Sequence, residues 1–374
     1  MSQHILYGDG SHRQVGDILA RAGARKYMLV CGKSFFGLSM SGYFANLTIP
    51  SVVFQDFSPN PVYEDVVRGV ARFRDEGCDA VVTVGGGSAL DVAKCIKLFC
   101  TLGPGGNYLH GAFKENAVPL IAIPTTAGTG SESTRFSVIY FGGEKQSVAH
   151  DSILPGWALL EPGVLGSLPP YQKKCALLDA LAQGIESWWS VNSTEESRAL
   201  SRMAVKSIVR GWRGYLTGDS EVAGRIMLAA NRSGQAINIT QTTAAHAMSY
   251  KLTSLYGIAH GLAVALCLPK VWLHMLRHPE KCADPRGGAY LSGVFADIAR
   301  SMDLPDPVAA ARWLESLPAE MGLSPDLRGL PADVDLLVAS VNLLRLKNNP
   351  VSLSPEDIRA LYLALSAKTG GMRE

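Results

Sequence analysis

Two histidines and one aspartate in the second half of the chain are of the types that bind a divalent metal ion. His246 and His260 lie in one glycine-interrupted segment, and Asp179 lies upstream in an otherwise apolar, helix-forming stretch. A carboxylate and two imidazoles suit zinc or iron and leave a coordination position open for a substrate oxygen. The pattern therefore predicts a site where a metal acts as a Lewis acid. The alternative is that both histidines are hydrogen-bonded core residues.

Gln183 lies four residues after Asp179. Both side chains therefore project from the same face of the predicted helix and can contact one ligand. An aspartate in so apolar a helix is costly unless it is paired or binds a cation, which favours a functional role. Gln183 offers a neutral oxygen, a weaker ligand than imidazole. We expect it either to coordinate the metal or to hydrogen-bond a water.

Two turns in the first half of the chain have the composition of phosphate-binding turns. Residues 85–88, Gly-Gly-Gly-Ser, join a predicted strand to a predicted helix, and the Thr- and Gly-rich residues 124–132 follow another strand. Backbone N–H groups at such turns can approach an anion at the positive end of a helix. Both turns are expected at the carboxyl ends of strands, where open α/β sheets bind ligands. Alternatively the glycines serve only a tight turn, since Leu90 breaks the strict dinucleotide-binding spacing.

The elements that must position these residues divide the chain into two parts. Up to residue 168, short β-rich runs alternate with helical patterns, which is typical of a parallel α/β sheet. From 169 to 374 helical patterns follow one another. We therefore expect an α/β nucleotide-binding domain over 1–168 and an all-helical domain over 169–374. The predicted strands are 27–31, 52–54, 80–84 and 118–124, and the predicted helices are 62–76, 91–98, 171–189, 194–216, 221–239, 244–256, 261–276 and a last one beginning at Pro355 with Ser354 as its cap.

The composition restricts the class of protein. A chain of 374 residues, 47% hydrophobic and 18% charged, suits two ordinary globular domains. The net charge of +2 comes without a run of Lys and Arg, so we expect no nucleic-acid partner. The start of the chain has no signal-like segment and no apolar run reaches membrane-spanning length, so we expect a cytoplasmic protein without membrane contact. Seven cysteines without a Cys-x-x-Cys pair are expected to be reduced core thiols.

Taken together, these segments resemble the iron-dependent, or group III, alcohol dehydrogenase family along essentially the whole chain. The matching motifs, in order, are Pro59-Asn60-Pro61, residues 85–94 (GGGSALDVAK), residues 124–132 (PTTAGTGSE), residues 179–181 (DAL), His246 and residues 257–261 (GIAHG). The resemblance implies a nucleotide-binding α/β domain followed by an all-helical domain, the fold shared with dehydroquinate synthase, with cofactor and metal in the cleft between them. It also implies a homodimer.

The resemblance carries the family's cofactor site onto residues of the first domain. The expected cofactor-binding residues are Gly32, Lys33, Asn60, Gly86, Gly87, Ser88, Asp91, Thr125, Thr126, Thr129, Val138, Lys145 and Leu165. Gly32 occupies the place where NAD-preferring relatives carry an aspartate for the adenosine ribose. Without that carboxylate a 2′-phosphate meets no repulsion, and Lys33 and Ser34 are near enough in sequence to contact it. We expect NADPH as the cofactor, with NADH as the alternative.

The family's metal site is matched in part. Asp179, His246 and His260 correspond to three of its ligands, whereas Gln183 stands at the position of its other histidine ligand. The expected metal ligands are therefore Asp179, Gln183, His246 and His260, and the expected metal is Fe(II) or Zn(II). Tyr250 replaces a further active-site histidine of the relatives. It either takes the proton-relay position or shapes the pocket, and it joins Asp179, His246 and His260 as an expected catalytic residue.

Within the family, residues 183–198 resemble the branch that reduces phosphonoacetaldehyde to 2-hydroxyethylphosphonate in phosphonate metabolism. A phosphonate dianion needs cationic partners, and Arg135 is the expected substrate-binding residue. Its alternative role is an ion pair at a domain interface. We therefore expect NAD(P)H-dependent, metal-assisted reduction of a small polar aldehyde to the alcohol. The alternatives are a general short-chain alcohol dehydrogenase, a dehydroquinate-synthase-like lyase, and a nucleotide-binding relative without redox activity.

Overall fold

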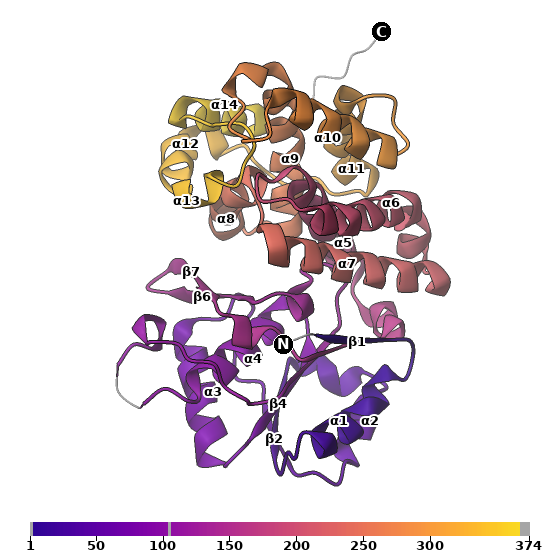
Figure 1. The fold of residues 1–374 in the computed structure, drawn as a ribbon, viewed down its shortest axis with the longest axis vertical. Helices are drawn as coiled ribbons and strands as arrows, with labels where there is room; N and C mark the ends of the chain where they lie inside the picture. Colours follow the sequence, from indigo (N-terminus) through magenta and orange to yellow (C-terminus); the bar gives the residue numbers. More distant parts are fainter. Residues whose placement is uncertain (1–2, 104–105, 367–374) are drawn as a thin grey trace. The chain divides into compact units, whose positions relative to one another are not determined.

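The computed structural model describes residues 3–103 and 106–366. The chain folds into two compact units, which can be followed by colour along the sequence in Figure 1. The first comprises Met1–Pro169 and Thr217–Gly234, and the second comprises Pro170–Leu216 and Gln235–Glu374. The chain thus enters the second unit, returns to the first, and then stays in the second. A division into domains at residues 168 and 169 stays a prediction.

A six-stranded sheet organises the first unit, in the order β1-β8-β5-β4-β2-β3. Its strands are β1 (His4–Tyr7), β2 (Tyr27–Cys31), β3 (Ser51–Phe54), β4 (Ala80–Gly85), β5 (Leu120–Pro124) and β8 (Trp157–Leu160). All neighbouring strands pair in parallel. Every residue of β2 and β5 is buried, as expected of central strands covered on both faces. The carboxyl ends of β5, β4 and β2 therefore lie beside one another at one edge of the sheet.

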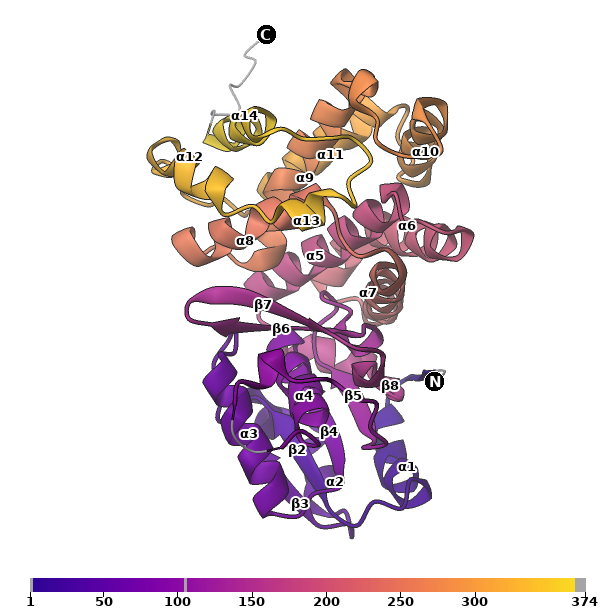
Figure 2. The same ribbon diagram turned by 60° about the vertical axis from the view of Figure 1, so that its left-hand side comes forward.

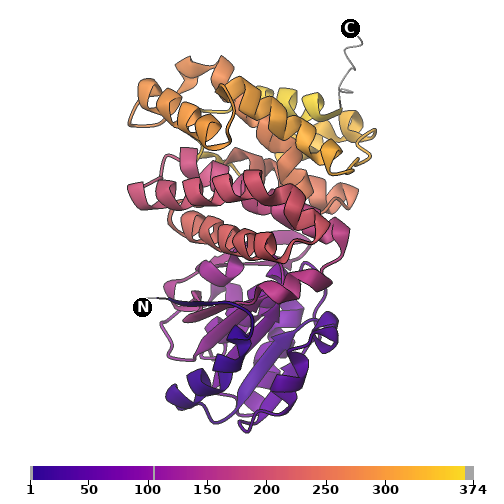
Figure 3. The same ribbon diagram turned by 90° about the vertical axis from the view of Figure 1, so that its right-hand side faces the viewer.

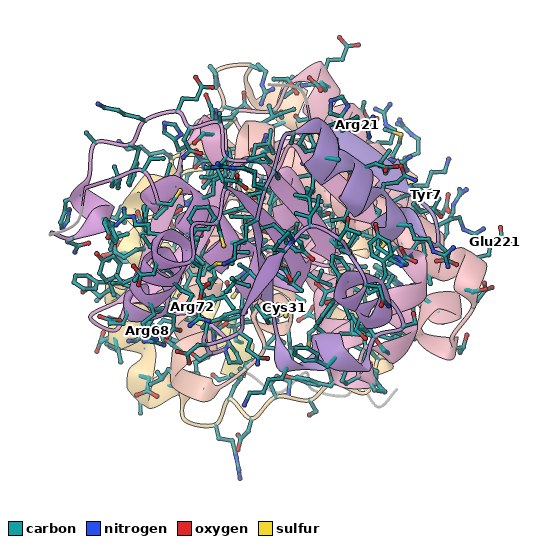
Figure 4. The ribbon with its side chains drawn as sticks, turned by 90° about the horizontal axis from the view of Figure 1, so that it is seen from below. Tyr7, Arg21, Cys31, Arg68, Arg72 and Glu221 are labelled. Atoms are coloured by element: carbon teal, nitrogen blue, oxygen red, sulfur yellow. The ribbon has the colours of Figure 1, made fainter. Side chains whose placement is uncertain are left out.

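Four helices cover this sheet: α1 (Val15–Arg21), α2 (Ser41–Ala45), α3 (Tyr63–Asp75) and α4 (Gly87–Phe99). In Figure 1, α1 and α2 lie on one side of β2 and β4, and α3 and α4 lie on the other. Figure 4 shows Cys31 inside the unit, whereas Arg68 and Arg72 project from α3 at its edge. Burial raises the pKa of the Cys31 thiol to about 11, so this thiol is protonated at neutral pH. All seven cysteines are free, and five of them are buried, whereas Cys100 and Cys282 are partly exposed.

An antiparallel hairpin departs from the parallel pattern. Strands β6 (Phe136–Phe141) and β7 (Glu144–Ala149) pair with each other and lie outside the main sheet, next to α4 (Figure 2). Tyr140 of β6 also forms an isolated parallel bridge with Val62. Their connection is Gly142-Gly143, with φ angles of 60° and 79°. Two successive positive φ angles are what a tight turn between twisted strands requires, and glycine adopts them without strain. The hairpin was not among the predicted elements.

The second unit contains helices and loops, and Figure 3 shows no strand in its described part. Its helices are α5 (Pro170–Trp189), α6 (Glu195–Thr217), the end of α7 (Ser220–Thr240), α8 (Ala244–Tyr256), α9 (His260–Arg277), α10 (Gly288–Ser301), α11 (Pro307–Glu320), α12 (Leu330–Ala339), α13 (Leu343–Leu346) and α14 (Pro355–Ser366). Over residues 3–103 and 106–366, no helix is long and apolar enough to cross a membrane.

The predicted fold class is confirmed: a parallel α/β unit is combined with a helical C-terminal part. The helices predicted over 171–189, 194–216, 221–239, 244–256 and 261–276 are α5 to α9, each within about one residue at either end. The cap of the last helix is also confirmed. The N–H of Asp357 donates to the Ser354 hydroxyl (3.2 Å), and the N–H of Ser354 donates to the Asp357 carboxylate (2.9 Å).

Candidate active site

Helix α5 buries three polar side chains on one face. Asp179, Gln183 and Glu186 follow one another at intervals of four and three residues, so they project from the same side of the helix. Their exposed fractions are 4%, 4% and 0%. Buried polar groups of this kind need partners, because an uncompensated one costs several kcal/mol. The partners of this face come from α8 and α9.

Helix α9 comes close to α5 because it has a glycine at the contact. A Cβ atom on Gly261 would lie 2.0 Å from the carbonyl oxygen of Cys175 and 2.8 Å from the Cβ of Asp179. No other residue type leaves room for this approach. The neighbouring residue, His260, is thereby held with its Nε2 3.9 Å from the Asp179 carboxylate. The Gly that follows His260 in the sequence is thus a packing requirement of the site.

Helix α8 supplies the second imidazole. The Nε2 of His246 lies 3.3 Å from Oδ1 of Asp179, and its Nδ1 makes a very short contact with the Glu186 carboxylate. His246 is 3% exposed. The structure therefore brings together Asp179, His246 and His260, each of which offers one ligand atom within 4.8 Å of the others. This is the spacing needed to hold one ion.

The charges of these groups support one another. Burial would raise the pKa of Asp179, but His246, His260 and the amide of Gln183 lower it below the usual value. Burial likewise opposes protonation of His246, yet the carboxylates of Glu186 and Asp179 outweigh it and raise the pKa of His246. The Asp179 carboxylate thus lies among three side chains that stabilise its negative charge. A divalent cation could replace the proton of His246 as the positive partner.

Gln183 fits a metal site for a different reason. Its Oε1 is buried and has no hydrogen-bond partner within the described part of the chain. A buried amide oxygen without a partner is costly, and a cation or a water next to it would remove that cost. The donor set of one carboxylate, two imidazoles and one amide oxygen is suited to Fe(II) or Zn(II). The residues present therefore fit a divalent metal.

The site is open to solvent on the side of His260. The His260 side chain is 36% exposed, whereas the side chains of Asp179 and His246 are buried. The Tyr250 ring stacks on the His260 ring, with centroids 5.7 Å apart and planes 17° apart. The Ser249 hydroxyl lies 3.4 Å from Nδ1 of His260. A substrate would therefore approach beside His260 and Tyr250.

The two predicted phosphate turns lie side by side in the first unit. Gly85, the last residue of β4, pairs with Pro124 of β5, and the N–H of Thr125 donates to the Gly85 carbonyl (3.0 Å). A Cβ on Gly87 would lie 3.0 Å from the Cγ2 of Thr129, and one on Gly86 would lie 3.2 Å from that of Thr126. Only glycine permits this close approach without displacing the threonines. Both turns can therefore contact one polyphosphate at the N-terminus of α4.

Other expected cofactor residues lie around these turns. Asn60 has a φ of 56°, and its N–H donates to the Ser88 hydroxyl (3.3 Å). Gly32 and Lys33 follow β2, the strand next to β4. The Asp91 carboxylate accepts hydrogen bonds from the Ser131 hydroxyl (3.1 Å) and from the backbone of Val138. It also interacts electrostatically with Lys145. Leu165 is completely buried, which leaves only its backbone for a ligand.

Two residues near these sites were not predicted. Lys94 is completely buried and donates to Ser131 (2.9 Å), Thr134 (2.9 Å) and the carbonyl of Phe136 (2.7 Å), so it holds the end of the second turn. The other residue is Glu186. Its signal in the sequence is a third polar residue on the polar face of α5, seven positions after Asp179.

Arg135 lies in the first unit and forms an ion pair with Asp151 (2.7 Å). The Arg135 side chain is 43% exposed and that of Asp151 is 81% exposed. Pairs this exposed contribute little to stability, so an anionic ligand could compete with Asp151 for the guanidinium. The role of Arg135 in substrate binding stays a prediction.

Comparison with known families agrees with this geometry. Residues 2–162 match the family model of iron-containing alcohol dehydrogenases, and residues 175–366 match the model of the C-terminal part of the same family. The chain therefore belongs to the iron-containing alcohol dehydrogenase family, and the predicted resemblance is confirmed. It is an alcohol dehydrogenase or aldehyde reductase.

Individual relatives cover most of the chain. Phosphonoacetaldehyde reductase of Streptomyces viridochromogenes is 32% identical over 338 residues, which are 83% of this chain and 82% of the relative. A probable alcohol dehydrogenase, EutG of Escherichia coli, is 31% identical over 96% of this chain and 92% of its own. The crystal structure of sulfoacetaldehyde reductase from Bifidobacterium kashiwanohense in complex with NAD+ superposes with a TM-score of 0.87, at 27% identity, over 98% of this chain and 97% of that one.

The packing of α9 on α5 generates the first prediction. Replacing Gly261 by Ala should displace His260 from Asp179 although no ligand is changed. The steric cost is about 1–3 kcal/mol, so metal affinity should fall roughly tenfold or more. Titration of the metal-free protein with Co(II) measures this affinity. Gly293→Ala, in α10 where an added Cβ meets nothing within 4 Å, is the control. Equal affinities of Gly261→Ala and the wild type would contradict the packing argument.

Proposed function

We propose that this protein reduces a small anionic aldehyde to the alcohol, with NADPH or NADH as the hydride donor and a divalent metal held by Asp179, His246 and His260. The observation that carries the proposal is the buried group of one carboxylate and two imidazoles, with the orphaned oxygen of Gln183 beside it. When bound, the metal would polarise a carbonyl oxygen and the reduced nicotinamide would supply hydride.

The chain's own residues have separate tasks in this proposal. Asp179 supplies the negative charge that retains a cation, and the imidazoles of His246 and His260 supply neutral donor atoms. Tyr250 stacks against His260 on the exposed side of the set, where its hydroxyl is the candidate donor of the proton that the alkoxide product requires. A water or the ribose hydroxyls of the cofactor are the alternative proton donors.

The substrate class is supported by two relatives. One is named a phosphonoacetaldehyde reductase and another a sulfoacetaldehyde reductase. Both names describe two-carbon aldehydes with an anionic group on the second carbon. Arg135 is the cation we propose for that group, because its exposed partner Asp151 can give way to an anion. Phosphonoacetaldehyde, reduced to 2-hydroxyethylphosphonate, is the proposed substrate.

The cofactor proposal rests on the end of β2. Gly32 leaves this position without a carboxylate, and Lys33 is exposed and forms no hydrogen bond or ion pair within the described residues. A 2′-phosphate would therefore meet a free cation and no negative charge. The NAD+ complex of the sulfoacetaldehyde reductase supports NADH as a second donor. For the metal we propose Fe(II), after which the family is named, with Zn(II) as the alternative. We further propose that the enzyme acts as a homodimer in the cytoplasm.

Metal-dependent aldehyde reduction is the second prediction. Metal-stripped protein should oxidise NADPH with phosphonoacetaldehyde only after Fe(II) or Zn(II) is restored. The double variant Asp179→Ala with His260→Ala should lose activity by roughly a thousandfold, because Lewis acidity contributes several kcal/mol. The circular dichroism spectrum and melting temperature of this variant serve as the folding control, since both substitutions lie in the helical second unit. Full activity of the stripped double variant would remove the metal from the mechanism. A product formed without net NADPH consumption would instead favour a lyase.

The third prediction concerns cofactor choice. Gly32→Asp should lower kcat/KM for NADPH by roughly tenfold or more, because a carboxylate would face the 2′-phosphate, while activity with NADH is retained. Steady-state kinetics with both cofactors measure the ratio. The control is Gly37→Ala, where an added Cβ meets nothing within 4 Å. An unchanged ratio in Gly32→Asp would place the adenosine ribose elsewhere.

The fourth prediction concerns Arg135. Arg135→Gln should reduce kcat/KM for phosphonoacetaldehyde by roughly 10- to 100-fold, as expected for the loss of a charged hydrogen bond. Activity with propionaldehyde, a neutral aldehyde, should change little. Arg25→Gln removes another exposed arginine that pairs with an aspartate, Asp79, and is the matched control. If both aldehydes are affected equally, Arg135 has a structural role and the anion is bound by another group.

A further inference from the structure

His246 lies between two carboxylates, and this placement limits where its proton can be. Its Nδ1 contacts Glu186, and its Nε2 lies 3.3 Å from Oδ1 of Asp179. A neutral imidazole has one N–H and one lone pair, so it can donate to only one of the two carboxylates. The other nitrogen then faces an acceptor with its lone pair. Either a second proton or a cation must lie on that side.

Glu186 is bound on every side by donors. Its Oε1 accepts hydrogen bonds from the hydroxyl of Thr243 (2.7 Å), from the N–H of Ala245 (2.9 Å) and from the N–H of His246 (3.3 Å), and its Oε2 faces the His246 ring. The Glu186 carboxylate is 0% exposed and also caps the N-terminus of α8. It is thus fixed as an acceptor, and the nitrogen of His246 that faces it must carry a proton.

We propose that Glu186 is a positioning residue, which holds the proton of His246 on Nδ1 and thereby directs the Nε2 lone pair toward Asp179 for metal coordination. The proposal rests on the metal site of the proposed function and assigns a role to a residue outside the ligand set. When one ring nitrogen of a metal-binding imidazole donates a hydrogen bond to a carboxylate, this bond fixes the tautomer and the orientation of the ring. It also makes the other nitrogen more basic and therefore a stronger metal ligand.

A second buried histidine, His12, makes the same contact between Nδ1 and a glutamate outside the predicted metal site. The Nδ1 of His12 lies 2.8 Å from Oε2 of Glu161, which also accepts from the backbone N–H of His12 (3.2 Å). Glu161 therefore binds its histidine through the same two groups as Glu186 does. Among the described residues, however, Glu161 is the only carboxylate within 4.0 Å of the His12 ring. The His12 ring therefore needs neither a second proton nor a cation, whereas the His246 ring needs one of the two.

The test is Glu186→Gln. The glutamine oxygen can still accept from Thr243 and from the N–H groups of α8, so the helix cap is retained. Its amide N–H₂ would face Nδ1 of His246 as a donor, which moves the ring proton to Nε2 and blocks the metal. We expect Co(II) affinity, measured by absorption titration of the metal-free protein against a competing chelator, to fall roughly 10- to 100-fold.

The tautomer gives a readout that a purely structural role would not change. In protein labelled with ¹⁵N-histidine, the Zn(II)-saturated wild type should show a proton on Nδ1 of His246, and metal-free Glu186→Gln should show it on Nε2. His246→Gln assigns the signals.

Two control variants separate positioning from stability. Glu161→Gln makes the same change at the His12 pair and should leave Co(II) affinity within about threefold of the wild type. Thr243→Val removes one donor to Glu186 and the acceptor of the Trp189 indole N–H (3.0 Å), so it should lower the melting temperature without a comparable loss of affinity.

Three results would overturn the proposed role of Glu186, and one of them would also overturn the metal site. Wild-type affinity in Glu186→Gln, or an equal loss in Thr243→Val, would assign Glu186 to the helix cap alone. A wild-type protein that binds no Co(II) would overturn the metal site of the proposed function and this inference with it. Tight binding by the wild type and by Glu186→Gln overturns the role of Glu186 only.

Discussion

The buried carboxylate of Asp179 is the group on which the arrangement of the second unit depends. An isolated charge of this kind would cost several kcal/mol in the interior, so the surrounding helices must supply compensation. They do so with His246 from α8 and His260 from α9, and the charge of Asp179 is favoured by both. A metal ion bound between Asp179, His246 and His260 would also compensate the negative charge, and it would act as a Lewis acid. The two imidazoles thus stabilise the buried negative charge of Asp179.

In each unit, close packing at glycines places the functional groups. Gly261 allows α9 to touch α5, which brings His260 to Asp179. Gly86 and Gly87 allow the threonines of the second turn to lie against the first turn, at the ends of β4 and β5. Both sites therefore rely on backbone approach that a single methyl group would prevent. Few side chains are reactive, and their positions depend on how closely α9 approaches α5 and how closely the two turns approach each other.

The sequence predicted much of this from composition and spacing. The helices α5 to α9 could be predicted because their apolar residues recur at helical intervals, and the turns after β4 and β5 because glycine and threonine gather there. The β6–β7 hairpin was missed, since alternation in 136–149 is weak and its turn depends on two glycines. Glu186 was missed because its partners, Thr243 and His246, lie far away in the sequence. Contacts between distant helices leave little trace in one sequence.

The central claim is that Asp179, His246 and His260 hold one catalytic metal ion. The most direct test is a crystal structure of the metal-loaded protein, with anomalous scattering recorded on both sides of the absorption edge of the metal. We predict one strong anomalous peak bonded to Asp179, His246 and His260. An ion bound elsewhere, with these three side chains in contact only with one another, would contradict the account.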